Sequence, residues 1–440
     1  MRQVLVAAAV VGLAGASAGV SPVMAQTAGI TIEQYRSDDP MLSLGSFAFA
    51  GGKTLALTVG VGSGAFRRPT DPPFQIWAVG DRGPNIACSE AKEVTGVERA
   101  TLCAAANNGR IYPRPGYSPS IYGLRLLPGT GRFVVTDVLP IKDASGVPVD
   151  GLLNPLTVAT TEIPLDGAGA RLAQNANAVD AEGVVRLADG SFWVGEENGP
   201  SLIQISAEGR ILARHVPAGT EGDFRGAAYP VQGTLPAILA KRATNRGIES
   251  IAIDPDERLI WTIVQNPLMN PDAAAYRDAR NARILAFDRA AGRVVAQYVY
   301  QMEPVSAYQR DRATTNNTVR ISEMLALGGG RFVVLERTEL TTKLYEISVA
   351  GATNILGTRW DDAATRPSLE QSNDLAPTGV VPVAKTLRFD SHLHPEIPTK
   401  IEGLAILGDG SLMMINDDDF GITGGSTIIS VVRGTGIRMQ

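Results

Sequence analysis

One hairpin-like stretch recurs along this chain of 440 residues and constrains its fold more than any other feature. In its clearest copy, residues 182–200, a glutamate opens an apolar run, an Asp-Gly turn follows, a second apolar run returns and an acidic pair closes the copy. Asp-Gly between two apolar runs is typical of a tight hairpin, because both residues tolerate the positive φ that such turns require. Each copy is therefore predicted to be an antiparallel β-hairpin.

Further copies follow at intervals of 67, 74 and 79 residues, and an N-terminal copy keeps only its second half, residues 75–81. The opening residues of the four complete copies are Glu182, Glu249, Glu323 and Glu402. A regular repeat of strand-rich units indicates a radial array, since one hairpin cannot bury both of its faces. Further strand pairs between the copies complete four-stranded units, so the predicted fold is an all-β propeller of five blades, with six as the alternative, and with short helical insertions.

The two acidic ends of each copy are expected at the same edge of the sheet, because residues equally far from a hairpin turn face each other. The expected pairs are Glu182 with Glu196 and Glu197, Glu323 with Glu336 and Arg337, and Glu402 with Asn416 and Asp417. If the copies surround one axis, these acidic ends converge at one mouth of the central channel.

The first 25 residues are typical of a secretory signal peptide, since Arg2 precedes a short apolar run rich in Ala and Gly that ends in small residues. Cleavage is expected before Gln26, which leaves residues 26–440 as one propeller domain. A membrane anchor is the alternative interpretation of this N-terminal segment. No later segment is long and apolar enough to span a bilayer. We expect a periplasmic or secreted bacterial protein that is monomeric and does not insert into a membrane.

The composition agrees with this interpretation. A hydrophobic fraction of 44%, with 47 glycines and 27 prolines, suits many short strands separated by turns. Loss of Arg2 with the signal peptide changes the net charge from −5 to −6, which argues against a nucleic-acid partner.

The two cysteines, Cys88 and Cys103, lie close together in the sequence, and an exported protein meets an oxidising compartment. We predict a disulfide between them, with two free thiols as the alternative. Closing so short a loop stabilises a protein by roughly 3 kcal/mol in the chain-entropy model. The stapled loop is expected to shape one wall of the mouth.

Several motifs resemble exported bacterial proteins of the family called esterase-like activity of phytase. They are residues 81–85 (DRGPN), 245–252 (NRGIESIA), 264–268 (VQNPL), 335–337 (LER), 400–405 (KIEGLA) and 416–421 (NDDDFG). The resemblance covers roughly residue 44 to the C-terminus, although the last motif reads Asn-Asp-Asp-Asp where a second Asn is common. It implies a propeller with phosphoesterase or carboxyl-esterase activity, by analogy with calcium-dependent propeller phytases.

A ring of carboxylates at one mouth would suffer like-charge repulsion of the kind that raises carboxyl pKa values, and a bound cation would remove it. Oxygen ligands, with only three histidines in the chain, favour Ca²⁺ over zinc, with Mg²⁺ or Mn²⁺ as lesser alternatives. The predicted ligands of one or more calcium ions are Asp81, Glu182, Glu197, Glu249, Glu323, Glu336, Glu402, Asn416 and Asp417. The alternative for each opening glutamate is that it caps backbone amides at the start of a strand.

Basic residues accompany the acids, and they could either neutralise a neighbouring carboxylate or hold an anionic oxygen of the substrate. The predicted catalytic residues are Glu182, Glu249, Arg246 and Arg337, with one glutamate as general base. The predicted substrate-binding residues are Arg82, Lys400 and Asn266. No Gly-x-Ser-x-Gly elbow occurs, and the pair His392 and His394 has no evident third metal ligand, so hydrolysis by metal-activated water is preferred.

Three functions follow from these patterns. The preferred one is an exported calcium-dependent hydrolase that acts on a small anionic ester of phosphate, which predicts a wide, solvated basin lined with cations. A metal-dependent lactonase or carboxyl-esterase would instead hold a deep ion in a closed apolar pocket. A non-catalytic ligand-binding propeller would expose aromatic side chains at the mouth.

Overall fold

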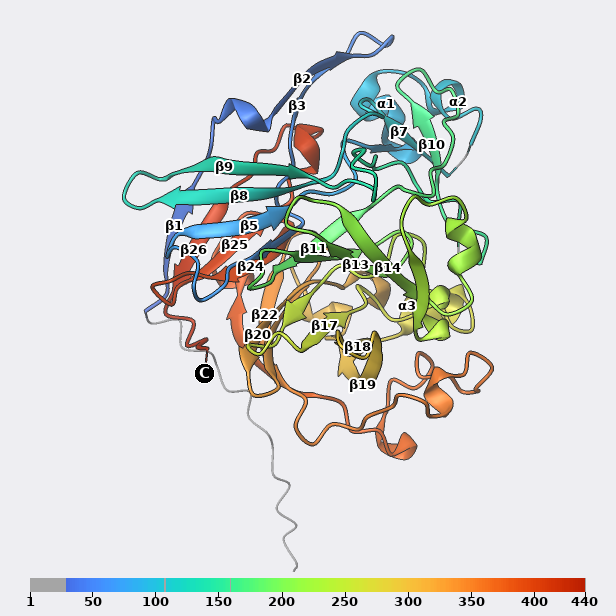
Figure 1. The fold of residues 1–440 in the computed structure, drawn as a ribbon, viewed down its shortest axis with the longest axis vertical. Coiled ribbons are helices and arrows are strands. Elements are labelled where there is room, and N and C mark those ends of the chain that lie inside the picture. Colours follow the sequence, from blue (N-terminus) through green and yellow to red (C-terminus); the bar gives the residue numbers. More distant parts are fainter. Residues whose placement is uncertain (1–28, 107, 159, 440) are drawn as a thin grey trace, which may run out of the picture.

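The computed structural model describes residues 29–439, apart from residues 107 and 159. The predicted signal peptide, residues 1–25, and its cleavage before Gln26 lie outside the described residues. The described chain is mainly β-structure, and it folds as a β-propeller (Figure 1), as predicted.

Five sheets of four or five strands make up the propeller in the described part of the chain. The first contains β4 (Gly64–Phe66), β5 (Gln75–Val79), β8 (Ser120–Leu127) and β9 (Arg132–Pro140). The second contains β11 (Ala181–Arg186), β12 (Phe192–Glu196), β13 (Ser201–Ile205), β14 (Ile211–Pro217) and β15 (Val231–Leu235). The third contains β16 (Ala252–Ile253), β17 (Leu259–Ile263), β18 (Asn281–Asp288) and β19 (Arg293–Gln301).

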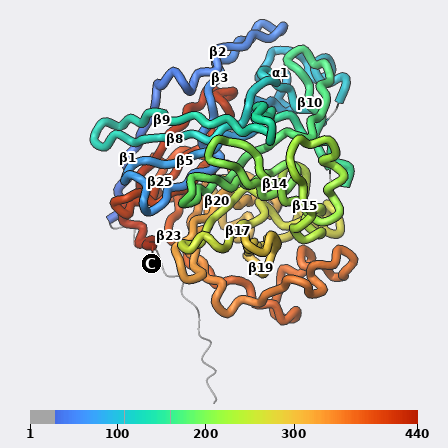
Figure 2. Tube along the Cα trace, in the orientation of Figure 1, coloured from blue at the N-terminus to red at the C-terminus, as the bar shows by residue number. Residues whose placement is uncertain are grey.

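The fourth sheet contains β20 (Arg320–Gly328), β21 (Arg331–Arg337), β22 (Thr342–Ser348) and β23 (Ala384–Asp390). The fifth contains β24 (Ile401–Ile406), β25 (Leu412–Asn416), β26 (Ile429–Arg433) and β1 (Thr31–Tyr35). Strand β1 pairs antiparallel with β26, so the two ends of the described chain complete one sheet (Figure 2).

The first strands of the five sheets follow one another around the centre. Strand β4 lies beside β11, β11 beside β16, β16 beside β20, β20 beside β24, and β24 beside β4 again. The sequence left five or six blades open, and this closed ring of inner strands passes through five sheets. One mouth of the ring therefore receives the ends of five hairpins.

The central strands of the sheets are apolar on both faces because each sheet packs between two neighbours. All residues of β12 and β25 are buried. Between the first and fifth sheets, for example, Ile76 and Leu124 pack with Met413 and Val431. Burial on both faces explains why the second halves of the hairpin copies are nearly continuous apolar runs.

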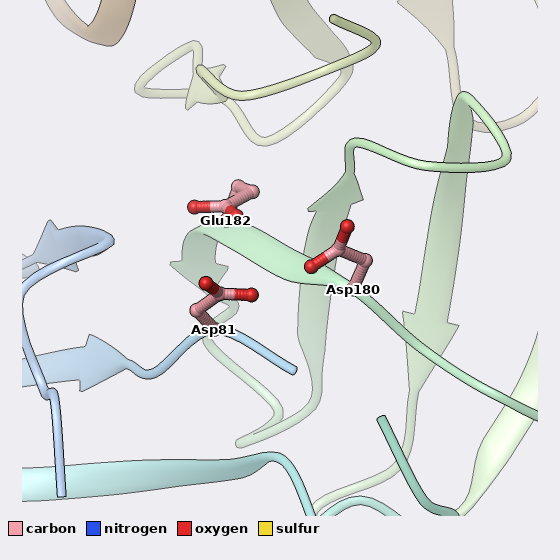
Figure 3. A group of neighbouring side chains, drawn as sticks. All are labelled: Asp81, Asp180 and Glu182. Atoms are coloured by element: carbon pink, nitrogen blue, oxygen red, sulfur yellow. The ribbon is translucent and has the colours of Figure 1, made fainter. Parts of the chain in front are cut away.

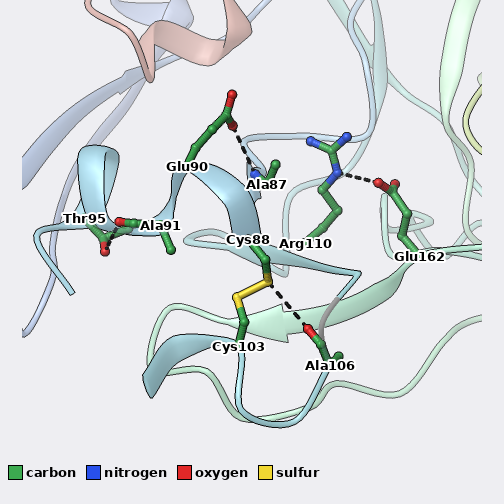
Figure 4. Close-up of a disulfide and its surroundings, with 9 residues drawn as sticks. All are labelled: Ala87, Cys88, Glu90, Ala91, Thr95, Cys103, Ala106, Arg110 and Glu162. Atoms are coloured by element: carbon green, nitrogen blue, oxygen red, sulfur yellow. Dashed lines mark hydrogen bonds and ion pairs between the residues drawn. A yellow bond between two sulfur atoms is a disulfide. The ribbon is translucent and has the colours of Figure 1, made fainter. Parts of the chain in front are cut away.

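A small lobe, which we call the stapled lobe, stands at the edge of the propeller. It contains β6 (Ile86–Ala87), α1 (Ala91–Thr95), α2 (Arg99–Leu102), β7 (Gly109–Tyr112) and β10 (Ile163–Asp166). Figure 1 shows α1, α2, β7 and β10 grouped together at the top right. The hairpin of β2 (Ser43–Ala48) and β3 (Thr54–Thr58) packs on it. The predicted disulfide between Cys88 and Cys103 is confirmed within this lobe (Figure 4).

The predicted helical insertions are short. Residues 271–283 contain α3 (Ala273–Asp278), and the insertion before the third sheet contains a 3₁₀ helix, Ala237–Lys241. Among the described residues, every helix is too short or too polar to cross a membrane.

Candidate functional site

A β-bulge at the start of the inner strands aims acidic side chains at the channel mouth. In β11, the pairing with β12 skips Glu182, which is the extra residue between Ala181 and Gly183. In β24, the pairing with β25 skips Glu402 in the same way. A bulge re-aims its extra residue and increases the local twist. At these two positions it brings a carboxylate into the wall of a polar cavity, which we call the basin.

The third sheet has an equivalent irregularity around Glu249. Ile248 faces Val264 and Ala252 faces Trp261, so one side has four steps where the other has three. Glu249 follows Ile248 directly and lies in this longer side, and its side chain also lines the basin.

The fourth sheet departs from the predicted alignment by one residue. The pairing of β20 with β21 skips Ser322, not Glu323, and Glu323 faces Leu335. The prediction that Glu323 lies opposite Glu336 and Arg337 is therefore wrong. A shift of one residue turns a strand side chain to the opposite face, and the structure does not bring Glu323 to the basin.

Glu323 caps backbone amides instead. Its carboxylate accepts hydrogen bonds from the backbone N–H groups of Ala65 at 3.2 Å, Met324 at 2.9 Å and Ile251 at 3.4 Å. These three amides belong to or adjoin different inner strands, β4, β20 and β16. The alternative considered for the opening glutamates thus describes this one, and Glu323 ties three sheets together.

Glu336 is also misplaced by the prediction, since it faces Ile321 and points away from the basin. Its carboxylate accepts hydrogen bonds from the hydroxyls of Tyr300 and Tyr308, both at 2.7 Å, and from the backbone N–H of Glu303 at 2.8 Å. The next residue along β21, Arg337, points to the basin because side chains alternate along a strand. A metal role for Glu336 is corrected to a structural one.

Two predicted amides lie outside the basin as well. Asn266 donates from its side chain to the carbonyls of Val319 at 2.6 Å and Asn317 at 3.4 Å. The side-chain oxygen of Asn416 accepts from the backbone N–H of Ile428 at 2.7 Å. Both side chains hold backbone in place, so neither the substrate role of Asn266 nor the metal role of Asn416 fits its position.

The structure brings the remaining predicted residues together around a cavity of about 410 Å³. They are Asp81, Arg82, Glu182, Glu197, Arg246, Glu249, Arg337, Lys400, Glu402 and Asp417. The stapled lobe adds Glu90, Glu93 and Val94 to the wall, as expected for the loop around the disulfide. The sequence predicted that acids distant along the chain meet at one mouth of the channel, and most of the predicted residues do line this cavity.

Two groups of carboxylates share Glu182, a residue that lines the basin. In one, oxygens of Asp81, Asp180 and Glu182 lie within 4.8 Å of one another (Figure 3), and in the other those of Glu182, Glu249 and Glu402 do. The sequence analysis missed Asp180. A signal was present, because Asp180 precedes Glu182 by two residues just as Lys400 precedes Glu402, and residues two apart on an extended chain share a face.

The three carboxylates of the first group outnumber the one guanidinium, that of Arg82, which forms an ion pair with Asp180. Burial raises the pKa of Glu182 well above its ordinary range, and the charges of Asp81 and Glu197 raise it further. Burial and the charge of Asp180 likewise raise the pKa of Asp81. For Asp180 itself, burial raises the pKa to about 6 even though Arg82 favours its ionised form.

Other acids of the basin differ according to the cations beside them. Burial raises the pKa of Glu197 to about 8, and it raises that of Glu402 well above its ordinary range although the charge of Arg337 opposes this. Burial would also raise the pKa of Asp417, but the charge and hydrogen bond of Lys400 outweigh it and hold that pKa below its ordinary value.

Arg82 is held firmly by its surroundings. Its guanidinium forms ion pairs with Asp180 at 3.0 Å and Glu162 at 3.2 Å, and donates to the side-chain oxygen of Asn245 at 2.8 Å. These contacts match the neutralising role, which was one of the two alternatives for the basic residues.

Arg337 connects the second carboxylate group to the fourth sheet. Its guanidinium pairs with Glu402, lies 4.0 Å from an oxygen of Glu249, and donates from Nε to the hydroxyl of Ser322 at 2.9 Å. The same hydroxyl donates to Glu249 Oε1 at 3.0 Å. Ser322, which the sequence analysis did not single out, thus holds an acid and a base of the basin in place.

Two other cations pair with acids of the rim. Arg246 Nη1 lies 3.5 Å from Glu197 Oε1, and Lys400 Nζ lies 2.9 Å from Asp417 and 2.5 Å from Asp419. Lys400 has a positive φ of 53°, an uncommon conformation for a residue with a side chain. Its ammonium group is fixed by two carboxylates.

Several buried polar atoms of the basin have no hydrogen-bond partner within the described chain. The acceptors are Glu197 Oε1, Glu249 Oε2 and Gln265 Oε1, and the donors include Arg337 Nη1 and Arg320 Nε. Asp180 Oδ1, which lies beside Asp81 and Glu182, is a further acceptor of this kind. Buried polar groups in native proteins are almost always paired. The basin therefore gathers both hydrogen-bond acceptors and donors whose bonding capacity the described chain does not fill.

Comparison with known proteins places this geometry in context. The model of a family described as "Phytase-like: Esterase-like activity of phytase" matches residues 105–420. An "Uncharacterized secreted protein" of Arthroderma benhamiae is 23% identical over 381 residues, which cover 77% of this chain and 72% of that protein.

Similar solved structures share little sequence with this chain. A luciferin-regenerating enzyme is 10% identical, with a TM-score of 0.36, over 94% of this chain and 98% of its own. The allergen Mala s 1 of Malassezia sympodialis is 11% identical, with a TM-score of 0.34, over 89% of this chain and 81% of its own. The WD40 repeats of RRP9 are 11% identical, with a TM-score of 0.33, over 88% of this chain and 99% of their own.

Proposed function

Because the chain belongs to the phytase-like family described by esterase-like activity of phytase, we propose that it is an exported hydrolase that cleaves phosphate esters with the help of calcium. The observation that carries this proposal is the convergence of Glu182, Glu249 and Glu402, whose carboxylate oxygens lie within 4.8 Å of one another beside a guanidinium group. The disulfide and a relative described as secreted support export.

Calcium fits the donors that surround the basin. All are oxygen atoms of carboxylates and amides, and no histidine or cysteine of the described residues lines the cavity. Asp81, Asp180 and Glu182 would hold a cation, and the unpartnered oxygen of Asp180 supports this assignment. A bound Ca²⁺ would neutralise these carboxylates and polarise an ester oxygen.

The character of the basin favours a phosphate ester over the two alternatives. Ten acidic and six basic residues line it, with only Val94, Phe420 and Ile422 as apolar members. A lactonase of the kind considered above would have a closed apolar pocket. A ligand-binding propeller would expose aromatic side chains at the mouth, whereas Phe420, the one aromatic residue lining the basin among those described, is only 2% exposed.

Glu249 is the residue placed to act as general base. Its Oε1 atom is oriented by the hydroxyl of Ser322 at 3.0 Å, while its buried Oε2 atom has no partner within the described chain. In the proposed reaction, Oε2 takes a proton from the water that attacks the ester. Glu182 belongs to both carboxylate groups and holds the negative charge that attracts the cation.

Arg337 is the residue placed to stabilise charge on the reacting ester. Its Nε and Nη2 atoms are engaged by Ser322 and Glu402, so its orientation is fixed before any substrate arrives. Its Nη1 atom is a buried donor without a partner within the described chain. A fixed donor aimed at developing negative charge stabilises a transition state without reorganisation.

The experiment that tests the proposal is an assay of the purified protein on phosphate esters, carboxyl esters and lactones, first with calcium and then with a chelator. We expect hydrolysis of phosphate esters that disappears on chelation and returns when calcium is added back. Cleavage of carboxyl esters or lactones alone would contradict the phosphate-ester assignment and favour the lactonase or carboxyl-esterase. Cleavage of none of the substrates would contradict the hydrolase and favour a ligand-binding propeller.

A further inference from the structure

A second cavity, which we call the apolar cavity, lies at the end of the channel opposite the basin. The glutamates of the basin stand at the beginning of inner strands, as Glu402 does in β24. The apolar cavity is lined by later residues of the same strands, including Ile253 at the end of β16 and Ile406 at the end of β24. Its volume is about 290 Å³, and among the described residues none lines both cavities.

Glu323 marks the boundary between the two cavities. Its carboxylate accepts hydrogen bonds from the backbone N–H groups of Ile251 and Met324, and both of these residues line the apolar cavity. The preceding residue, Ser322, donates from its hydroxyl to Glu249 of the basin. Along β20 the chain therefore passes from the basin to the apolar cavity within three residues, and the apolar cavity is a separate site.

The wall of this second cavity is mainly apolar, in contrast to the basin. Strands β16, β20 and β24 contribute Ile253, Met324 and Ile406, and Phe66 at the end of β4 joins them. The C-terminal segment adds Met439, which is 42% exposed. A concave surface of aliphatic and aromatic side chains with a few polar groups is typical of a site for a small apolar molecule.

One cation in this wall has no acid beside it. Arg67 follows β4 directly and lines the cavity, and it forms no ion pair within the described chain. Its Nε atom donates to the carbonyl of Pro72 at 3.1 Å, and its Nη2 atom donates to that of Asp71 at 2.6 Å. Its Nη1 atom donates no hydrogen bond within the described chain. Burial lowers the pKa of Arg67, because the apolar surroundings disfavour its charged form.

The neighbouring charges are used within the protein. Arg68, which also lines the cavity, pairs with Glu257 at 2.9 Å. Asp71, on the same loop as Arg67, pairs with Arg186 at 3.3 Å. The two carbonyl contacts of Arg67 hold its guanidinium in place, and they leave one edge of it without a partner in the described chain.

We propose that the apolar cavity binds a small aliphatic carboxylate, such as a medium-chain fatty acid, with its chain against Ile253, Met324 and Ile406 and its carboxylate on Arg67. A guanidinium group binds a carboxylate through charge-assisted hydrogen bonds, which are stronger than those between neutral groups. The volume lies near the lower end of the roughly 300–1,000 Å³ that small-molecule sites span, so the chain must be short. The site does not depend on the proposed hydrolase activity.

The test is a calorimetric titration of sodium octanoate into the full chain, with a chelator present so that calcium does not bind the octanoate. We expect saturable binding. The alcohol 1-octanol should bind weaker by roughly tenfold or more, because it has the same chain without the charge. Hexanoate should also bind roughly tenfold more weakly, since two fewer CH₂ groups leave water.

Two variants assign the binding to this cavity. Arg67→Gln should weaken octanoate binding by roughly tenfold or more and leave the affinity for 1-octanol unchanged. Ala326→Phe should abolish the binding of both, because Ala326 lines the cavity and a larger side chain fills part of it. The matched control is Arg132→Gln in β9 of the same sheet as β4. Arg132 is exposed and does not line the cavity, so the affinity should stay that of the wild type.

The proposal is overturned if the wild type shows no saturable binding of octanoate, or if 1-octanol binds as tightly as octanoate. It is also overturned if either Arg67→Gln or Ala326→Phe binds octanoate as the wild type does. Circular dichroism checks that each variant is folded, and a loss of affinity confined to the carboxylate in Arg67→Gln is a result that misfolding does not produce. Octanoate binding without hydrolysis of any ester would leave this site standing and contradict only the hydrolase.

Discussion

The hairpins β11–β12 and β20–β21 occupy equivalent places in their sheets, yet they present opposite charges to the basin. The bulged residue is Glu182 in the first hairpin and Ser322 in the second. At the end of its second strand, the first hairpin brings Glu197 to the basin and the second brings Arg337. The basin therefore has an acidic side, where oxygen atoms lack partners, and a basic side, where guanidinium donors do. The two hairpins share one backbone plan but carry side chains of opposite charge. One cavity therefore has carboxylates suited to a cation and guanidinium groups suited to an anion.

The acidic side should carry the largest effect on activity. We expect Glu182→Gln to lower kcat/KM for the substrate found in the assay by roughly a hundred- to a thousandfold, because Glu182 is shared by both carboxylate groups. The free energy of unfolding in the presence of a chelator should stay the same or rise. The variant removes a buried carboxyl group whose pKa is raised by burial and by neighbouring acids, which means that its ionised form is unfavourable there. Steady-state kinetics and denaturant unfolding measure the two effects.

Glu208→Gln is the control for that change, because Glu208 is an exposed residue in the β13–β14 turn of the same sheet. It should change neither activity nor stability. If Glu182→Gln kept wild-type activity, the acidic side would have no part in the chemistry.

In the hairpin on the basic side, the change with the largest expected effect is at Glu323, which the register turns away from the basin, and that effect is on stability. We expect Glu323→Leu to lower the free energy of unfolding by about 3 kcal/mol, because backbone amides near three inner strands lose their acceptor. Glu323→Gln keeps one side-chain acceptor and should lose less. Denaturant unfolding of both variants measures the difference, and equal stability of Glu323→Leu and wild type would mean that Glu323 does not tie the sheets together.

The sheet that carries the acidic side also holds a histidine that should make it sensitive to acid. His215 of β14 stacks on Trp193 of β12, and burial lowers its pKa to about 4. Below the unfolded value of about 6.5 the unfolded chain binds a proton that the folded chain does not bind until about pH 4. Stability should therefore fall as the pH drops through this window, by up to about 3 kcal/mol from His215.

Denaturant unfolding between pH 4 and 7 measures this dependence. In His215→Gln the slope of the unfolding free energy against pH should be smaller across the window than in the wild type. A variant with the wild-type slope would show that His215 does not contribute to the acid sensitivity.

Much of the fold could be predicted because a β-hairpin leaves a pattern in a short stretch of sequence, namely two apolar runs joined by turn residues. The Asp189-Gly190 turn has the positive φ at Gly190 that the pattern requires, and the apolar runs beside it become strands buried on both faces. The arrangement of the sheets in a ring was predicted from the repetition of such copies along the chain. The same logic predicted that acids distant in the sequence meet at one mouth.

The parts of the site that could not be predicted depend on single-residue register. Glu323 looked like the opening glutamate of its copy, but the bulge falls on Ser322, and a slip by one residue exchanges the two faces of a strand. Asn266 and Asn416 were assigned to the basin from their neighbours, although an amide can satisfy backbone groups equally well. Arg320 was missed because nothing in its own hairpin copy distinguishes a basin arginine from a surface arginine.

Ser322 offers the smallest and most direct test of the contrast between the two hairpins. It occupies the bulge position that Glu182 occupies in β11, and its hydroxyl joins Glu249 Oε1 to Arg337 Nε. We expect Ser322→Ala to lower kcat by roughly tenfold with little change in KM, because the general base and the charge-stabilising donor lose their common partner while the basin keeps its charges. Ser322→Thr keeps a hydroxyl and should restore most of the rate; if alanine and threonine behave alike, the bulge in this sheet is only a feature of the backbone.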